Sequence, residues 1–307
     1  MLVSIIVPCF NHSKYLYDRL QSIFNQSYQN FELILLDDAS TDGSGKILES
    51  YKEHPKVSNC IINDTNSGST FHQWNKGVNL AKGELIWIAE SDDIADKNFL
   101  KNLIPEFESN PNLTLAYTQS FRMNANGEIT GTWKSYTDDL DKNKFENNFT
   151  IDGMKYIRSF LNKKNTIPNA SAVIFKRKNF YEVGASDPQL KYIGDWDLWY
   201  RLLSKGDIYF DSQCLNYFRY HDTSVISKAF KNNERPIELE VQVILFFKKL
   251  LIFFKNDPEL NQQLKRSLKY AIKNTFKLAL QQQHMKRQYL FFTFKQYLTF
   301  LFKLRFI

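Results

Sequence analysis

Apolar and amphipathic segments alternate along the first hundred residues of the chain. Short apolar runs rich in β-branched residues predict buried strands over residues 2–7, 31–36, 57–62 and 85–89. Apolar residues at helical spacing predict helices over about 13–26, 44–53 and 70–81. Strands and helices that alternate with a period of about 25 to 30 residues are typical of a parallel sheet with helices on its faces.

The pattern changes after residue 111. Two apolar runs flank the turn signal Asn124-Ala125-Asn126-Gly127, which predicts a hairpin of strands 113–121 and 128–133. The polar segment 134–148 is predicted to be a loop. Further helices are expected over 151–161, within 192–203, and over 234–254, 258–283 and 285–307, and further strands over 170–175, 207–210 and 215–220. We therefore predict an α/β fold with a mostly parallel sheet flanked by helices, followed by an α-helical C-terminal tail.

Polar and acidic residues follow the predicted strands of the first half. The strand 85–89 leads directly into Glu90, Asp92 and Asp93, three carboxylates within four positions. Because the carboxyl ends of parallel strands meet at one edge of a sheet, these groups are expected to converge with Asn11, Asp37, Asp38 and Asp64. Carboxylates so close together indicate a Mg or Mn ion that carries phosphates. The alternative is a loop of solvated acids, or Asp92 as a helix cap.

Charge divides the chain into two parts. Residues 1–228 hold 25 Lys and Arg against 28 Asp and Glu, a net charge of −3, whereas residues 229–307 hold 15 against 5, a net charge of +10. From Leu260 onward there are ten basic residues and no acidic one. We predict one domain over 1–228, with halves 1–110 and 111–228, and a basic, aromatic-rich helical extension over 229–307.

The remaining composition narrows the class of protein. Three widely spaced cysteines favour neither a disulfide framework nor a zinc site, and they fit a reducing, cytoplasmic compartment. The apolar run at the N-terminus lacks a basic region before it, so we interpret it as the first strand rather than a signal peptide. No window reaches 18 uninterrupted apolar residues, so a spanning helix is not expected. The protein is expected to be soluble or peripheral.

Five short motifs occur in an order that resembles a known family. They are Val7-Pro8-Cys9-Phe10-Asn11, Leu36-Asp37-Asp38-Ala39-Ser40-Thr41-Asp42, Asn66-Ser67-Gly68, residues 83–93, and Gly194-Asp195-Trp196-Asp197-Leu198-Trp199-Tyr200-Arg201. In order and spacing these resemble the family-two glycosyltransferases of GT-A fold, a Rossmann-like sheet. The likeness covers about residues 1–225. It implies a nucleotide-sugar donor in the half 1–110 and an acceptor in the half 111–228.

The resemblance also implies roles for individual residues. It places Pro8, Phe10 and Asn11 near the nucleobase of the donor. It implies that Asp38 forms a hydrogen bond with the nucleobase, that Asp37 lies nearby, and that Asn66 from the third motif also binds the nucleotide sugar. It places Asp92 and Asp93 at the metal and ribose positions, and Asp195 at the position of the catalytic base. The usual Asp-x-Asp-Asp is here Glu-x-Asp-Asp, so the ribose or metal contact of the longer Glu90 is in question.

The chemistry of sugar transfer agrees with these roles. A leaving nucleoside diphosphate needs a counter-charge, which Mg or Mn supplies, and the acceptor hydroxyl needs a base. His221 follows a strand end, where a neutral imidazole reaches the metal or diphosphate, or else serves a structural role. Trp196 either stacks on a sugar or fills the core. Asp197 is expected to be a structural cap or a salt-bridge partner of Arg201. With one base, direct displacement inverts the anomeric carbon.

We therefore predict an inverting transferase that moves a sugar, with UDP-sugar as the favoured donor, to a hydroxyl of a glycan or polyprenyl-linked acceptor in bacterial surface polysaccharide synthesis. A sugar-phosphate nucleotidyltransferase is the first alternative, although Pro8-Cys9-Phe10-Asn11 has no glycine for a phosphate loop. The second is a non-catalytic family member that acts as a scaffold, an idea prompted by Glu90.

The tail 285–307 combines basic residues with thirteen large apolar ones in 23 positions. This composition suits an interfacial helix on an anionic membrane surface, such as the inner face of the cytoplasmic membrane where a lipid-linked acceptor resides. The alternative is a helix packed on the body or on a second subunit of a homodimer. Nucleic-acid binding is not expected, because the aromatic residues belong to no recognised module.

Overall fold

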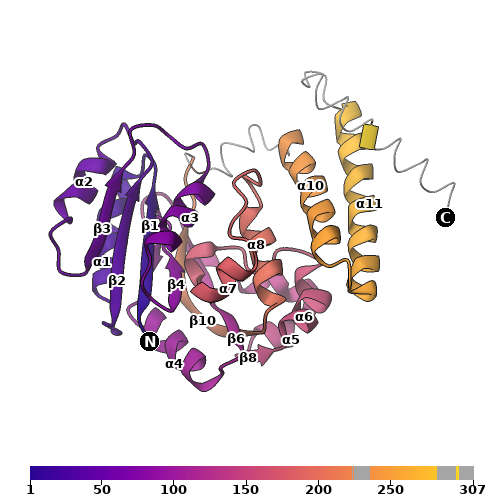
Figure 1. Ribbon diagram of the computed structural model, residues 1–307, viewed down its shortest axis with the longest axis horizontal. Coiled ribbons are helices and arrows are strands. Elements are labelled where there is room, and N and C mark those ends of the chain that lie inside the picture. Colours follow the sequence, from indigo (N-terminus) through magenta and orange to yellow (C-terminus); the bar gives the residue numbers. More distant parts are fainter. Residues whose placement is uncertain (223, 225–235, 282–294, 297–307) are drawn as a thin grey trace. The chain divides into compact units, whose positions relative to one another are not determined.

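A computed structural model describes residues 1–222, 224, 236–281 and 295–296 (Figure 1). The chain divides into two units. The first comprises Met1–Gln189 and Leu198–His221, and the second comprises Leu190–Asp197 and Asp222–Ile307. The structural division falls after His221 and assigns the short internal segment Leu190–Asp197 to the second unit. The domain boundary expected after residue 228 stays a prediction.

The first half of the first unit alternates strands and helices as its hydrophobic pattern predicts. Its elements are β1 (Val3–Cys9), α1 (Ser13–Phe24), β2 (Phe31–Asp37), α2 (Ser44–Ser50), β3 (Val57–Ile62), α3 (Thr70–Leu80), β4 (Leu85–Ile88), β5 (Ile94–Ala95) and α4 (Phe99–Ser109). Every residue of β1, β2 and β4 is buried, as expected of central strands covered on both faces.

The second half adds strands to the same sheet. Its elements are β6 (Leu113–Met123), β7 (Ile129–Thr132), η1 (Lys134–Thr137), α5 (Asp138–Phe145), β8 (Phe149–Ile151), α6 (Gly153–Tyr156), η2 (Ile157–Leu161), η3 (Ala170–Ala172), β9 (Val173–Lys176), α7 (Arg177–Glu182), α8 (Gly194–Leu203) and β10 (Asp207–Arg219). The sheet order is β3-β2-β1-β4-β9-β6-β10-β5, with β7 on β6 and β8 on β10. Strands β1 to β4 run parallel, and β10 runs parallel to β6. The α/β fold with a mostly parallel sheet is thus confirmed.

Helices α1 and α3 pack closely against the central strands. Helix α1 buries Leu16, Leu20 and Ile23 on one face, and Arg19 lies on that same buried face. Gly77 lets α3 approach β1, because a Cβ atom at this position would stand 2.4 Å from Cγ2 of Ile6. This tight packing fixes the loops that follow β1 and β4 at one edge of the sheet.

Three segments of the second half differ from the prediction. The supposed loop 134–148 contains η1 and α5, whose single buried apolar residue, Phe145, packs on Phe149, Phe160 and Phe210. A single apolar residue gives no hydrophobic periodicity from which a helix could be predicted. The strand expected from residue 170 begins at Val173, after the short 3₁₀ helix η3. The strands predicted over 207–210 and 215–220 form one strand, β10, which continues through the polar residues 211–213 that separate the two apolar runs and shifts its register against β6 near Cys214.

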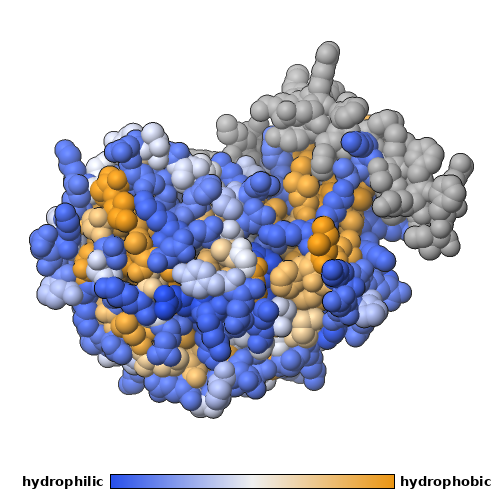
Figure 2. All heavy atoms as spheres, viewed as in Figure 1, coloured by the Kyte–Doolittle hydropathy of each residue, from blue (hydrophilic) through white to orange (hydrophobic). Residues whose placement is uncertain are grey.

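The second unit contains the antiparallel pair α10 (Ile237–Phe253) and α11 (Pro258–Gln281), which lie side by side in Figure 1. Figure 2 shows both hydrophobic and hydrophilic atoms over these helices. Across the described ranges, none of the helices has the length and apolar character needed to cross a membrane. The interfacial helix predicted for 285–307 lies outside the described residues except for 295–296.

Candidate functional site

The carboxyl ends of β1, β2 and β4 meet at one edge of the sheet. Cys9 at the end of β1 lies opposite Asp37 at the end of β2, and Ile6 lies opposite Ile88 at the end of β4. The polar groups that follow these strands therefore come together although they are distant in sequence, as the alternating pattern predicts.

Asp38 is the centre of the loops that follow β2 and β3. Its Oδ1 atom accepts hydrogen bonds from the side chains of Asn63 (2.8 Å) and Gln73 (2.7 Å), and Ser67 donates to the same carboxylate through its backbone N–H and its hydroxyl. The side-chain amide of Asn66 donates to the backbone oxygen of Asp38 at 2.9 Å. Asp38 and Asn66 therefore hold one loop structure in place at the predicted donor edge.

Asp37 and Asn11 order the neighbouring turn. Oδ2 of Asp37 accepts the Ser40 N–H at 2.8 Å. Asn11 adopts a left-handed backbone conformation with φ of 57°, and its Oδ1 accepts the Thr41 N–H at 2.8 Å. These contacts join the ends of β1 and β2. They also bring together two residues, Asn11 and Asp37, that the sequence placed in the donor site.

Pro8 and Phe10 flank the end of β1 in different environments. Pro8 is buried within the strand, opposite Leu36 of β2. The ring of Phe10 is 41% exposed, which is unusual for phenylalanine in a chain with so large a core. An exposed aromatic ring beside a polar loop is a suitable surface for a flat ring such as a nucleobase.

Glu90 begins the acidic segment after β4. Its Oε1 accepts a hydrogen bond from the indole Nε1 of Trp74 at 2.8 Å, and its backbone N–H donates to the Ser171 hydroxyl at 3.1 Å. Burial, together with the charge of Asp92, raises the pKa of Glu90 to about 8. The longer side chain is therefore anchored to α3, and it is mostly protonated at neutral pH.

Two buried arginines compensate the acidic segment. The Nε atom of Arg19 donates to the backbone oxygen of Glu90 at 2.9 Å, and its guanidinium lies over the Trp87 ring. The backbone N–H of Arg219 donates to Oδ1 of Asp93 at 2.9 Å, and its Nε donates to the backbone oxygen of Asp92 at 2.7 Å. Burial and the neighbouring Asp92 raise the pKa of Asp93, which Arg19 partly offsets.

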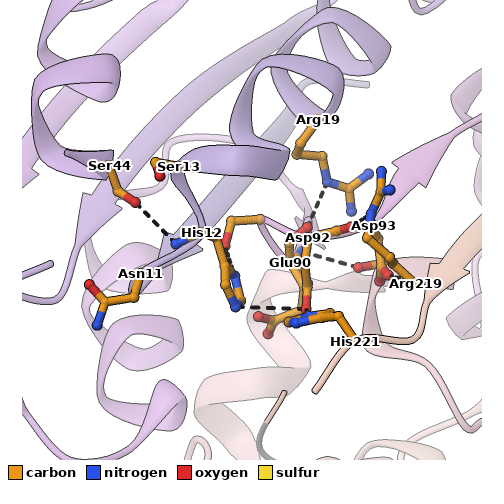
Figure 3. A network of polar contacts seen from close by, with 12 residues as sticks. Asn11, His12, Ser13, Arg19, Ser44, Glu90, Asp92, Asp93, Arg219 and His221 are labelled. Atoms are coloured by element: carbon orange, nitrogen blue, oxygen red, sulfur yellow. Dashed lines mark hydrogen bonds and ion pairs between the residues drawn. The ribbon is translucent and has the colours of Figure 1, made fainter. Parts of the chain in front are cut away.

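His12, Asp92 and His221 point toward one another, whereas Asn11 points away (Figure 3). Nε2 of His221 lies 2.9 Å from Oδ2 of Asp92, and Nε2 of His12 lies 3.9 Å from the same oxygen. Burial raises the pKa of Asp92, but the two imidazoles lower it by more, so its carboxylate stays ionised.

This trio fits a divalent metal ion. One potential ligand atom from each residue lies within 4.8 Å of the other two, and imidazole nitrogen and carboxylate oxygen are both good metal ligands. Asp92 and His221 were expected at the metal, and the structure brings them together. Asp93, which was also expected there, instead turns its Oδ1 to the backbone of Arg219. Its metal role stays a prediction.

Three residues of this site were missed from the sequence. His12 lies in the turn after β1 and carried no motif. Arg219 lies two positions before His221 and gave no signal of its own in the sequence. Arg19 did carry a signal, because a basic residue four positions from both Tyr15 and Ile23 falls on the apolar face of α1. A buried cation on such a face indicates buried carboxylates nearby.

Asp195 and its neighbours belong to the second unit. Asp195 is partly exposed in the first turn of α8, where its Oδ1 accepts the Trp196 N–H at 2.7 Å. Asp197 is fully buried and forms an ion pair with Lys249 of α10 at 3.0 Å. The Trp196 ring packs on Phe246 of α10 with 4.8 Å between centroids, which favours a core role over stacking on a sugar.

Comparison with known proteins shows the family of this chain. Residues 4–184 match the family model described as glycosyl transferase family 2. The glycosyltransferase GlyG of Streptococcus pneumoniae is 37% identical over 107 residues, which are 35% of this chain and 35% of that protein. TuaG of Bacillus subtilis, provisionally named as a teichuronic acid biosynthesis glycosyltransferase, is 27% identical over 250 residues, 80% of this chain and 91% of that protein.

Solved structures agree on the fold. The 1–349 fragment of S. aureus TarS in complex with UDP-GlcNAc superimposes with a TM-score of 0.71 at 18% identity, covering 95% of this chain and 79% of that chain. The complex of the same fragment with UDP gives a TM-score of 0.64 at 18% identity and covers 90% and 72%. This likeness shows the fold that these chains share.

Proposed function

Because this chain belongs to glycosyl transferase family 2, we propose that it transfers a sugar from a nucleoside diphosphate donor, with UDP-sugar favoured, to a hydroxyl group of a glycan or lipid-linked acceptor in surface polysaccharide synthesis. The observation that carries this proposal is the convergence at one sheet edge of the Asp37–Asp38 loops and the trio His12, Asp92 and His221. The names of TuaG and of the TarS complexes support a surface-polymer role and a UDP-sugar donor.

The donor would be held by two parts of this edge. Phe10 offers its exposed ring to the base, and the loop ordered by Asp38 lies beside it at the ends of β1 and β2. Asp92, His221 and His12 would hold a Mg or Mn ion. Such an ion supplies the positive charge that a leaving diphosphate requires. The buried Arg19 partly offsets the repulsion between the neighbouring carboxylates, and Arg219 holds the acidic segment through its hydrogen bond to the Asp92 backbone oxygen.

Asp195 is proposed as the base that takes the proton of the acceptor hydroxyl. It is the partly exposed carboxylate of its motif, whereas Asp197 is buried and paired with Lys249. A single base suits direct displacement, in which the acceptor oxygen forms its bond to the anomeric carbon as the diphosphate leaves. The configuration of the product is then inverted.

A screen of nucleotide sugars with and without Mn²⁺ tests this function. We expect one UDP-sugar to be hydrolysed or transferred faster than the others, and only with a divalent ion. NMR of the product reports the configuration of the new bond. Retention of configuration would refute the one-base mechanism.

The same screen separates the two alternatives. Formation of a nucleotide sugar from a sugar phosphate and a nucleoside triphosphate would indicate a nucleotidyltransferase. A thermal shift with UDP and Mn²⁺ but no turnover of any donor would indicate a scaffold. No shift with any nucleotide would contradict the donor site itself.

A second property is proposed for α11, namely docking on an anionic membrane surface. Lys265, Lys269, Lys273 and Lys277 follow one another at four-residue intervals, roughly 6 Å apart, and all four are exposed. Tyr270 and Leu280, each 69% exposed, lie on the same helix. An anionic surface would attract the lysines, at about 1 kcal/mol for each one, and accommodate the two exposed apolar side chains.

Flotation with vesicles tests the docking. The full chain should float with vesicles that contain phosphatidylglycerol and not with phosphatidylcholine alone. Replacing the four lysines of α11 by glutamine should reduce binding by up to about 10³, because each lysine contributes about 1 kcal/mol. The matched control replaces Lys46, Lys52, Lys101 and Lys178, four exposed lysines of the first unit, by glutamine. Equal losses in both variants would exclude α11 as the docking surface.

A further inference from the structure

We propose that His12 is a direct ligand of the divalent ion, and that its imidazole gives the site a preference for Mn²⁺ over Mg²⁺. This inference rests on the proposed function and deepens it. The family resemblance implied metal contacts for Asp92 and Asp93 only, and His221 was added as a residue at a strand end. His12 carried no motif, so its role depends on the folded structure.

The distances support a shared ion. The Nε2 atoms of His12 and His221 lie 3.9 Å and 2.9 Å from Oδ2 of Asp92. Metal bonds to nitrogen and oxygen are about 2 Å long, so two ligands of one ion stand roughly 3 to 4 Å apart. The three residues come from three separate parts of the chain, and one potential ligand atom of each lies within 4.8 Å of the other two.

The hydrogen bonding of the His12 ring suits coordination through Nε2. Nδ1 of His12 lies 2.8 Å from the hydroxyl oxygen of Ser91, which is buried directly before Asp92. When Nδ1 carries the proton and donates it to this oxygen, the lone pair is on Nε2, the atom nearest Asp92. Histidine ligands commonly donate their second N–H in this way, which fixes the orientation of the ring.

The backbone holds His12 in place before any ion binds. The His12 N–H donates to the Ser44 hydroxyl at 3.1 Å, and the His12 carbonyl oxygen accepts the N–H groups of Tyr15 and Leu16 at the start of α1. The side chains of His12 and Asp92 are 16% and 17% exposed. The ligand atoms are thus preorganised, and an ion can reach them from solvent.

The ligand types determine which ion is preferred. Mg²⁺ favours oxygen ligands and keeps several waters, whereas imidazole suits transition-metal ions. Two imidazoles and one carboxylate therefore favour Mn²⁺. Asp93 would add a second hard oxygen, but its Oδ1 accepts the Arg219 N–H. The competing explanation is that His12 only balances the charge of Asp92, and that role would not discriminate between ions.

The ratio of the dissociation constants for Mg²⁺ and Mn²⁺ distinguishes the two roles. Mn²⁺ binding is measured in the presence of UDP by the electron paramagnetic resonance signal of free Mn²⁺, and Mg²⁺ binding by competition. His12→Phe keeps a planar ring beside Tyr15 and His221 but offers no lone pair. We expect the ratio to fall by roughly tenfold or more in this variant. The control His72→Phe alters an exposed histidine of α3 and should keep the ratio of the unmodified protein.

A second variant keeps the test decisive if His12→Phe does not fold. His12→Asp supplies an oxygen ligand in place of nitrogen, so it should shift the preference toward Mg²⁺. Pulsed spectroscopy of bound Mn²⁺ should detect couplings to two histidine nitrogens in the unmodified protein and to one in either variant. An unchanged ratio, or two nitrogen couplings in either variant, would overturn the inference. If the unmodified protein binds neither Mn²⁺ nor UDP, the proposed function fails as well. If the unmodified protein transfers sugar but the His12 variants keep its ratio of dissociation constants, only the inference fails.

Discussion

Nε2 of His221 lies 2.9 Å from Oδ2 of Asp92, although 129 residues separate them in the chain. The pairing of two strands produces this contact. Strand β10 runs antiparallel to β5, with Tyr217 opposite Ile94, so the residues after β10 return to the residues before β5. A hydrogen bond from the Arg219 N–H to Asp93 holds the two segments together. The candidate metal site thus depends on the last strand of the sheet.

Asp92→Asn should weaken the binding of a metal–nucleotide complex. Both imidazoles face Oδ2 of Asp92, so loss of the negative charge removes the group that they share. We expect sugar transfer to fall by about 10² or more, because stabilisation of the leaving group is lost. Calorimetry with UDP and Mn²⁺ should show weaker binding. Glu53→Gln, at an exposed carboxylate, is the control, and equal activity in both variants would refute the metal assignment.

Asp195→Asn should lower kcat by about 10² to 10⁴, since a general base is removed, and leave donor affinity unchanged. Steady-state kinetics with a saturating donor measure kcat, and calorimetry measures the affinity for the donor. Asp197→Asn is the informative comparison. It breaks the ion pair between a buried carboxylate and Lys249, so it should lower the free energy of unfolding by about 1–3 kcal/mol. A variant of Asp195 that keeps most of its turnover would end the role as base.

Phe10→Ala should weaken nucleotide binding without weakening the fold. The ring is 41% exposed, so its removal leaves no cavity in the core. Stacking of an aromatic side chain on a base contributes about 1–3 kcal/mol, and the dissociation constant for UDP should rise accordingly. Tyr17→Ala removes another exposed ring, 64% exposed on α1, and serves as the control. Equal affinities in the two variants would place the base elsewhere.

Asp38→Asn should both destabilise the protein and weaken UDP binding. Its carboxylate accepts hydrogen bonds from Asn63, Ser67 and Gln73. In asparagine an NH₂ group replaces one of the two oxygens, and this donor would face groups that are themselves donors. We expect a loss of about 1–3 kcal/mol in the free energy of unfolding, measured in urea. Ser67→Ala removes one of these hydrogen bonds and should cause a smaller loss. Unchanged stability of Asp38→Asn would contradict the loop-ordering role.

Protonation of Glu32 should lower the free energy of unfolding at acidic pH. Burial raises its pKa, but hydrogen bonds to Oε1 from the Ser4 hydroxyl and the Lys82 N–H, each 2.6 Å long, lower it by more. Because the pKa is lower in the folded state, the stabilisation is present above the ordinary glutamate value of about 4.3 and is lost as the pH falls through the folded value.

Glu32→Gln tests this dependence, because its amide oxygen still accepts both hydrogen bonds but does not titrate. Urea unfolding at pH 7 and at successive values below 5 should show a smaller loss of stability in the variant than in the unmodified protein. Parallel curves for the two proteins would show that Glu32 does not contribute to the acid sensitivity.

The fold could be predicted well because its signals are local. The apolar runs of β1, β2 and β4 and the periodicity of α1 and α3 are properties of adjacent residues. The hairpin of β6 and β7 is confirmed for the same reason, since its turn residues are contiguous. Segment 134–148 escaped prediction because α5 is held by one buried side chain, Phe145, and a single residue has no period.

The donor half of the site was accessible for a related reason. Asp37 ends a strand, Asp38, Glu90 and Asp92 lie within four positions after one, and parallel strands bring their carboxyl ends to one edge. The partners of these acids were not accessible. Asp38 pairs with Gln73 across 35 positions, and Asp93 pairs with Arg219 across 126. Such pairings depend on loop paths and side-chain rotamers.

By itself the sequence determined the family, the parallel sheet and the edge where acidic groups gather, since hydrophobic periodicity and short motifs depend only on neighbouring residues. Only the tertiary structure decided that His12 joins Asp92 and His221, that Arg19 lies buried beside the acids, and that Asp93 turns to Arg219. The physical reason is that charge pairing and metal ligation act over a few ångströms in space, and the packing of distant segments sets those distances.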